Sequence, residues 1–444
     1  MLNPARPFFY LLAYLAVLYL RPQEYVPSLI GTALVPASLL FAVALWLIAQ
    51  PKNFEAPQHG LMLALAAAMG LSVLASGWMM GAIKVVTQFV PTLLVFYLVA
   101  TSVDSLKRFR EICLVLSLLS AVMALHGIEQ AAQEGGIGWT GAEMIQGRIT
   151  YLGFLNDPND LAMAFLISLP LTLYLARVTD SFWLRHAAHA AAALTAYGIY
   201  LCNSRGSMLG LGAMLACWVS RRYGTLRGLL VLPVLLLGLL LLGPSRINEM
   251  AVDEESAAGR IDAWYAGFEM FREHPLLGVG SGQFTDYNPL TAHNSFVLAL
   301  AEMGLLGYGI WMAILLVSAA MLWQVLTLAP LHVAVPLPAA DAAAGEEPAP
   351  PEPLPLWSDV QRAGAALAYA FIGALVSAFF LSRSYVVFLY LLVALVVALH
   401  QLARRHWPEL APVRLGAMAG RLVMTPLVSI AALWLLTRSL LNFA

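Results

Sequence analysis

The stretch from Pro244 to His293 is polar, although long apolar runs flank it on both sides. It contains Arg260 and ends at His293, where the chain enters the next apolar run. A neutral imidazole can accept a proton from a hydroxyl group, and a guanidinium group can hold phosphate oxygens. Arginine beside membrane-embedded helices is costly unless it meets an anion or a carboxylate. This stretch therefore predicts proton-transfer chemistry on an anionic substrate at a water–lipid boundary.

Two further arginines are expected at the same membrane face. Arg205 lies in the tight turn NSRG between two apolar runs, and Arg148 closes a glycine-rich polar connection. Guanidinium groups from separate turns suit the oxygens of a diphosphate in a low-dielectric setting. Together with Arg260, these residues predict that a diphosphate leaving group is neutralised without a metal ion.

The run Asn156–Asp160 admits two interpretations. The simpler one is a turn followed by a helix that Asn159 or Asp160 caps. Alternatively, Asp157 and Asp160 bind magnesium, which would need more carboxylates nearby. No second histidine or cysteine stands at metal-ligand spacing from His293, so we expect no metal site and no cofactor.

Apolar and aromatic residues inside the polar stretch recur at helical spacing. Asp253–Ser256 predicts the start of this helix, and His274-Pro275 predicts its end. Such a helix can lie on the bilayer with Arg260 at headgroup depth, which is the alternative to an anion site. Gly278–Gly282 predicts a hinge rather than a phosphate loop, because no strand precedes it. The residues at helical spacing are Ile261, Trp264, Tyr265, Phe268 and Phe271.

The elements that carry these residues are predicted from the apolar runs. The chain is 61% hydrophobic and 11% charged, which predicts an all-α, polytopic membrane helix bundle with about 12 transmembrane helices. The net charge of -1 gives no reason to expect nucleic-acid binding. Residues 422–442 contain Arg438 and predict either a further span or an interfacial helix. The expected spans are 8–24, 29–49, 60–80, 82–101, 112–128, 160–177, 187–203, 207–220, 228–243, 297–327, 361–382 and 385–401.

Lysine and arginine are concentrated in the connections that share one side with the N-terminus, which predicts that this side is cytoplasmic. The loop 244–293 then lies outside, and the proline-rich loop 329–359 is a disordered cytoplasmic linker. Residues 1–401 are expected to form the transmembrane domain, with 402–444 as a C-terminal tail. Glu302, near the outer end of a span, is expected to pair with an external arginine.

In this order, these motifs resemble the O-antigen ligase and O-antigen polymerase superfamily of bacterial cell envelopes. The resemblance covers roughly residues 8 to 400, and only the ordered set of motifs is specific. The matching motifs are LRPQEY (20–25), NDPNDLA (156–162), NSRG (203–206), Arg260 with Trp264, PLLGVG (275–280), HNS (293–295) and AEMG (301–304).

The resemblance implies a GT-C-like glycosyltransferase of the bacterial inner membrane, with a large periplasmic loop and the active site facing the periplasm. It implies metal-independent, inverting transfer of a glycan from undecaprenyl diphosphate to an acceptor hydroxyl. The acceptor would be the lipid A core, a protein or another glycan, and membrane lipids would surround the protein. By position, Arg205 and Arg260 would bind the diphosphate, with Arg148 and Asn159 as further donor-binding residues. His293 would be the catalytic base.

Two other functions remain open from the sequence. A polysaccharide polymerase of the same superfamily would differ in its acceptor alone. A transporter or flippase for lipid-linked sugars would need inverted repeats and charges at mid-membrane depth. The sequence shows no internal repeat, which favours a transferase.

Overall fold

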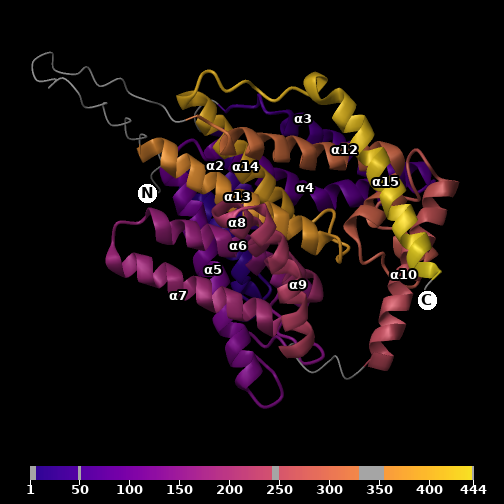
Figure 1. The fold of residues 1–444 in the computed structure, drawn as a ribbon, viewed down its shortest axis with the longest axis horizontal. Helices are drawn as coiled ribbons and strands as arrows, with labels where there is room; N and C mark the ends of the chain where they lie inside the picture. The colour runs from indigo at the N-terminus through magenta and orange to yellow at the C-terminus, as the bar shows by residue number, and fades with distance from the viewer. Residues whose placement is uncertain (1–6, 49–51, 243–249, 330–354, 443–444) are drawn as a thin grey trace, which may run out of the picture.

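The computed structural model describes residues 7–48, 52–242, 250–329 and 355–442 (Figure 1). These residues are mainly helical, and they contain two isolated β-bridges but no named strand. The all-α prediction is therefore confirmed. The long helices are α1 (Pro7–Leu20), α2 (Leu34–Ile48), α3 (Pro57–Ala75), α4 (Met79–Ser102), α5 (Leu106–Ala132), α6 (Pro158–Val178), α7 (Phe182–Leu201), α8 (Arg205–Tyr223), α9 (Thr225–Leu242), α10 (Met250–Glu273), α12 (Ser295–Leu326), α13 (Pro355–Ala378), α14 (Val387–His406) and α15 (Ala419–Leu441), with short turns η1 (Pro22–Glu24), η2 (Gly153–Leu155), α11 (Phe284–Tyr287) and η4 (Gly416–Met418).

Eight helical segments of the described residues are long and apolar enough to cross a membrane. They are α3, α4, α5, α6, α12, α13, α14 and the segment Gly416–Leu441 that contains α15, and α2 is a shorter apolar helix. The chain is thus a multi-pass membrane protein. Every predicted span overlaps one of the long helices, whereas the count of twelve spans stays a prediction.

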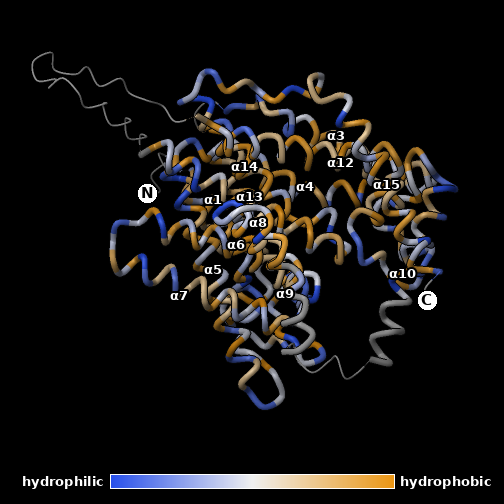
Figure 2. Tube along the Cα trace, viewed as in Figure 1, coloured by the Kyte–Doolittle hydropathy of each residue, from blue (hydrophilic) through white to orange (hydrophobic). Residues whose placement is uncertain are grey.

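α6 and α14 form the centre of the bundle. Their most apolar windows are 78% and 89% buried inside the protein, and both helices are apolar around most of their circumference (Figure 2). Small residues let neighbouring helices approach closely, since a Cβ added at Gly210 of α8 would lie 2.8 Å from the carbonyl oxygen of Gly373 in α13. By contrast, the window in Gly416–Leu441 is 11% buried, and α15 packs against α10 and α12 at the edge of the bundle.

Two sequence predictions concern segments at the edges of the described ranges. Most of the predicted disordered linker 329–359, residues 330–354, lies outside the described residues. Its last five residues, 355–359, begin α13, so that part of the prediction is wrong. The predicted helix start at Asp253–Ser256 is wrong, because α10 already begins at Met250. Acidic residues are favourable in the first turns of a helix as well as at its cap, so their presence alone does not locate the cap.

The motif of residues 20–25 forms a local structure after α1. Arg21 adopts a left-handed backbone conformation, with φ 49°, and forms an ion pair with Glu24. A Cβ at Gly153 would lie 2.2 Å from Nε of Arg21, so this side chain fills the space beside η2. These contacts give the motif a structural role.

α12 is broken at Gly304, whose φ of 59° and ψ of −163° are not helical. Inside a bilayer, backbone groups freed by such a break need partners from the protein. The segment Pro275–Gly280 supplies them, so the glycine-rich stretch that the sequence indicated as a hinge is anchored to α12. The four hydrogen bonds run from Val279 N to Ala301 O (3.0 Å), Gly280 N to Glu302 O (3.0 Å), Leu305 N to Pro275 O (2.8 Å) and Leu306 N to Leu276 O (3.2 Å).

Glu302 lies beneath this anchored segment and is 3% exposed. One carboxylate oxygen accepts from the Phe284 amide at 3.4 Å, and within the described part of the chain the carboxylate forms no ion pair. The predicted pairing with an external arginine is therefore wrong. Burial and the neighbouring Glu302 carboxylate raise the pKa of Tyr385 well above its ordinary value, which places that phenol beside the carboxylate. The packing of the anchored segment encloses residue 302 and separates it from the outer surface.

Replacing Gly278 with alanine is expected to destabilise the protein. Gly278 has a φ of 71°, and an added Cβ would lie 2.3 Å from the Glu302 carbonyl carbon. The strain and the displaced backbone should together cost about 1–3 kcal/mol, seen as a lower Tm in detergent. Gly309→Ala, in the open part of α12, is the matched control, because its Cβ would meet nothing within 4 Å. Equal melting temperatures for the two variants would contradict the anchoring role.

Candidate active site

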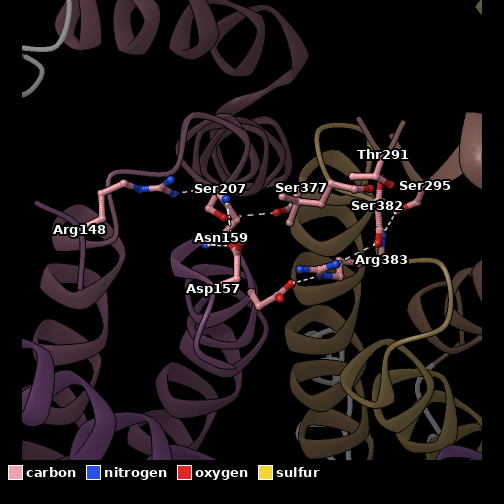
Figure 3. Close-up of polar contacts among 11 residues, drawn as sticks. Arg148, Asp157, Asn159, Ser207, Thr291, Ser295, Ser377, Ser382 and Arg383 are labelled. Carbon is pink, nitrogen blue, oxygen red and sulfur yellow. Dashed lines mark hydrogen bonds and ion pairs between the residues drawn. The ribbon is translucent and has the colours of Figure 1, made fainter. Parts of the chain in front are cut away.

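Four chain segments that are distant in sequence meet at one end of the bundle (Figure 3). They are the N-terminal ends of α6 and α8, residues 379–386 after α13, and residues 291–295 at the start of α12; we refer to them as the helix-end junction. Ser207 and Ser377 share a hydrogen bond of 3.2 Å, which joins α8 to α13. Thr291 donates to the Ser382 hydroxyl at 2.8 Å, which joins the start of α12 to the segment after α13.

The N-terminus of α6 is capped by Asp157. Its carboxylate accepts the backbone N–H of Asn159 at 2.7 Å, and Pro158 occupies the first helical position. Proline is favoured there because its missing N–H needs no partner, so the helix begins earlier than predicted. The predicted cap at Asn159 or Asp160 is therefore wrong. Their side chains, in the first turn of the helix, are available for other contacts.

Arg148 and Asn159, both predicted as binding residues, contact each other directly (Figure 3). The Arg148 Nη2 atom donates to the Asn159 amide oxygen at 2.6 Å. Its Nε atom donates to the Cys202 carbonyl at 2.8 Å, at the end of α7. Arg148 thus ties the polar connection after α5 to the α7–α8 turn, which directly precedes Arg205.

Arg383 is a site residue that was not predicted from the sequence. Its Nε atom donates to the Asp160 carboxylate, and its backbone N–H donates to the Ser295 hydroxyl at 2.9 Å (Figure 3). Asp160 is 4% exposed, so the ion pair is partly shielded from water and fixes the guanidinium group in place. The signal that pointed to Arg205 applies here too, since Arg383 lies in a short turn between two apolar runs.

His293 lies in the connection before α12 with a left-handed backbone conformation, φ 47°. The next residue, Asn294, caps α12 by accepting the N–H groups of Phe296 and Val297 at 2.9 and 3.2 Å. A histidine in this conformation is uncommon, and the capped helix that follows holds it there. The half-buried imidazole is therefore presented at the junction by a rigid element.

Charges around His293 favour its neutral form. Burial is the largest effect that lowers its pKa below the ordinary value, and the positive charges of Arg260 and Arg383 lower it further. Asp157 opposes them with a smaller effect. Arg260, Arg383 and Asp157 are therefore close enough to the ring for their charges to act on it. A neutral imidazole beside two guanidinium groups can accept a proton while anionic oxygens bind nearby.

Arg260 is held at the junction by the packing of α10. Trp264, one turn further along, lies edge-on to Phe379 with ring centroids 5.5 Å apart. Trp264 and Phe268 are each 7% exposed, so this face of α10 packs against protein. The alternative that the aromatic face lies on the bilayer is therefore wrong for these two side chains. An apolar helix face is equally suited to contact a bilayer or the packed ends of α12 and α13, so the sequence pattern alone does not distinguish the two.

Arg205 begins α8 and is exposed, and Ser204 caps the helix by accepting from the Ser207 N–H at 3.4 Å. A Cβ at Gly206 would lie 2.8 Å from Cβ of Phe380, so the start of α8 packs against the segment that contains Arg383. Arg205 thus belongs to the helix-end junction. Its position at a helix N-terminus, where N–H groups point outward, suits a bound anion.

The described residues contain no group of three or more His, Cys, Asp and Glu side chains that could hold a metal ion. Of the two carboxylates in the magnesium interpretation, Asp157 caps α6 and Asp160 pairs with Arg383. Within the described ranges, the further carboxylates that magnesium would need are therefore not assembled around them.

A comparison with protein-family models gives a match. The family model described as O-antigen ligase matches residues 190–312, from α7 into α12. This range includes Arg205, Arg260 and His293 and ends before Arg383. No match was found among the curated proteins.

Proposed function

We propose that this chain, which belongs to the O-antigen ligase superfamily, transfers a glycan from undecaprenyl diphosphate to an acceptor hydroxyl. The observation that carries the proposal is the imidazole of His293 lying among the charges of Arg260 and Arg383, with its pKa lowered. Such a group suits proton acceptance next to a bound diphosphate. The lipid A core is the acceptor favoured for an enzyme of the ligase type.

In this mechanism, guanidinium groups bind the donor. Arg205 and Arg260 hold oxygens of the diphosphate, whose negative charge grows as the bond to the sugar breaks. Fixed positive charges in a partly water-excluded site stabilise that developing charge, so no metal ion is needed. Arg148 and Asn159, joined by their hydrogen bond, form a further contact for the donor.

His293 acts on the acceptor. The acceptor oxygen forms a bond to the anomeric carbon while the bond from that carbon to the diphosphate oxygen breaks. The electron pair of the broken bond leaves with the diphosphate, and the hydroxyl proton passes to the imidazole. Attack from the face opposite the leaving group inverts the anomeric configuration. The Asp160 carboxylate keeps the Arg383 guanidinium group beside the ring.

The proposed arrangement in the membrane follows the distribution of basic residues. The chain is a multi-pass protein of the bacterial inner membrane, and the helix-end junction faces the periplasm. Residues 1–401 form a transferase domain of the GT-C-like kind, which includes the periplasmic loop 244–293 and the cytoplasmic connection between α12 and α13. Residues 402–444 form a C-terminal tail.

The purified full chain in lipid nanodiscs, supplied with a defined undecaprenyl-diphosphate glycan, tests this function. Three acceptors are compared: lipid A core, an acceptor peptide and a second lipid-linked glycan. We expect an inverted glycosidic product, with EDTA present, on the lipid A core. Product only on the lipid-linked glycan would indicate a polymerase. Movement of the donor across a proteoliposome membrane without any bond formation would replace the proposal with a transporter.

The pH dependence of transfer is expected to report on His293. Protonation of the ring removes the base, so kcat/KM falls as the pH drops through its pKa, which lies below the ordinary 6.5. Arg383→Gln removes a positive charge that lowers the His293 pKa, so that pKa rises and the acidic limb moves to higher pH. Arg272→Gln, on the exposed side of α10, should leave the profile unchanged. An unmoved limb in Arg383→Gln would contradict this role for Arg383.

A further inference from the structure

A cavity of about 500 Å³ lies between α6, α8 and α13. Its volume is in the range of roughly 300–1,000 Å³ that ligand pockets occupy. Aliphatic and aromatic side chains make most of its wall, and Leu173 and Leu215 are 39% and 40% exposed. Because α6 and α13 are long and apolar enough to cross a membrane, exposed leucines at the rim open the cavity toward the surrounding lipid.

One end of this cavity is cationic. Arg177, Arg221 and Arg362 line it, and the charges of Arg177 and Arg221 both act on the hydroxyl of Tyr369. Arg362 lies 3.6 Å from the Asp359 carboxylate. Within the described ranges, neither Arg177 nor Arg221 forms an ion pair. The cavity thus carries positive charge that the neighbouring side chains do not fully neutralise.

The cavity is separate from the candidate active site. Arg177 and Arg221 lie in the last turns of α6 and α8, whereas Asp160 and Arg205 lie in the first turns of the same helices. The two sites are therefore at opposite ends of these helices. In the predicted orientation, the cationic end faces the cytoplasmic leaflet, where anionic lipids concentrate and basic pockets between transmembrane helices bind their headgroups.

We propose that this cavity binds a phospholipid with an anionic headgroup. The phosphate lies between Arg177 and Arg221, and an acyl chain lies along the apolar wall at Leu173 and Leu215. Charge complementarity identifies the headgroup, and the continuous apolar wall distinguishes a lipid from a soluble anion, which would leave that wall unused. This site does not depend on the proposed transferase activity.

Native mass spectrometry of the full chain, titrated with phosphatidylglycerol or phosphatidylcholine, tests the site. We expect phosphatidylglycerol to bind preferentially, and Arg177→Gln/Arg221→Gln to weaken that binding roughly thirtyfold. Arg185→Gln/Arg222→Gln is the matched control, since it removes the same charge from exposed residues that do not line the cavity. Equal losses in the two double variants, or equal binding of both lipids, would overturn the proposal.

A cavity-filling variant tests the contribution of the acyl chain to binding separately from the contribution of the arginines. Ala365→Trp places a large ring in the cavity without changing any arginine, and should also reduce phosphatidylglycerol binding. Thermal unfolding of each variant checks that it is folded. Inorganic phosphate is titrated in parallel. If phosphate stabilises the wild-type chain as much as the lipid does, and Ala365→Trp weakens the binding of neither ligand, the occupant is a soluble anion. That outcome would refute the lipid proposal.

Discussion

His293→Ala is expected to lower the rate of glycan transfer by about 10²–10⁴-fold. The imidazole is the proposed acceptor of the hydroxyl proton, and Arg260 and Arg383 lower its pKa without binding that proton themselves. Donor binding should change little, because the guanidinium groups remain. Single-turnover rates and donor affinity, measured on the same preparation, check the two halves of this expectation.

Two variants control for structural effects at this position. Asparagine tolerates the left-handed backbone conformation of residue 293. His293→Asn should therefore keep the fold and lose as much activity as His293→Ala. His274→Ala removes an exposed histidine directly after α10 and should retain activity. If His293→Asn kept the wild-type rate, the imidazole would not be the base and the mechanism would fail.

Arg205→Ala and Arg260→Ala are each expected to lower kcat/KM by about 10²–10³-fold. Both guanidinium groups are proposed to hold the same diphosphate, so the double variant should lose less than the product of the two single losses. Lysine at either position should restore activity only partly, because an ammonium group cannot make the bidentate contact of a guanidinium.

Arg272→Ala is the matched control for Arg260→Ala. It lies on the same helix, is exposed, and pairs with Glu269. We expect it to leave transfer and melting temperature unchanged. Full activity in Arg205→Ala and Arg260→Ala together would refute diphosphate binding by this pair, even if His293 proved essential.

The anchored segment explains how a loop can hold such a site. Pro275–Gly280 is bound to the broken part of α12, so the chain from α10 back to His293 is attached at both ends to rigid helices. Loss of this anchorage should displace both Arg260 and His293. Site geometry and protein stability are therefore expected to depend on the same glycines, Gly278 and Gly304.

Local sequence was enough to predict the helices and several of the site residues. A backbone in lipid must satisfy its hydrogen bonds within the segment, so a long apolar run predicts a helix without knowledge of its neighbours. Local sequence also predicts Arg148 and Arg205 as site residues, because a charge in a short polar connection between such runs is costly unless it binds an anion or a carboxylate.

Only the tertiary structure determined which residues meet. Asp160 and Arg383 are 223 positions apart and contact each other because α6 and α13 pack side by side. Trp264 faces Phe379 instead of lipid, and Glu302 is enclosed by the anchored segment instead of pairing with an arginine. Apolar patterns specify that a face is buried, but a membrane and another helix bury it equally well. The partner is decided by packing over the whole bundle.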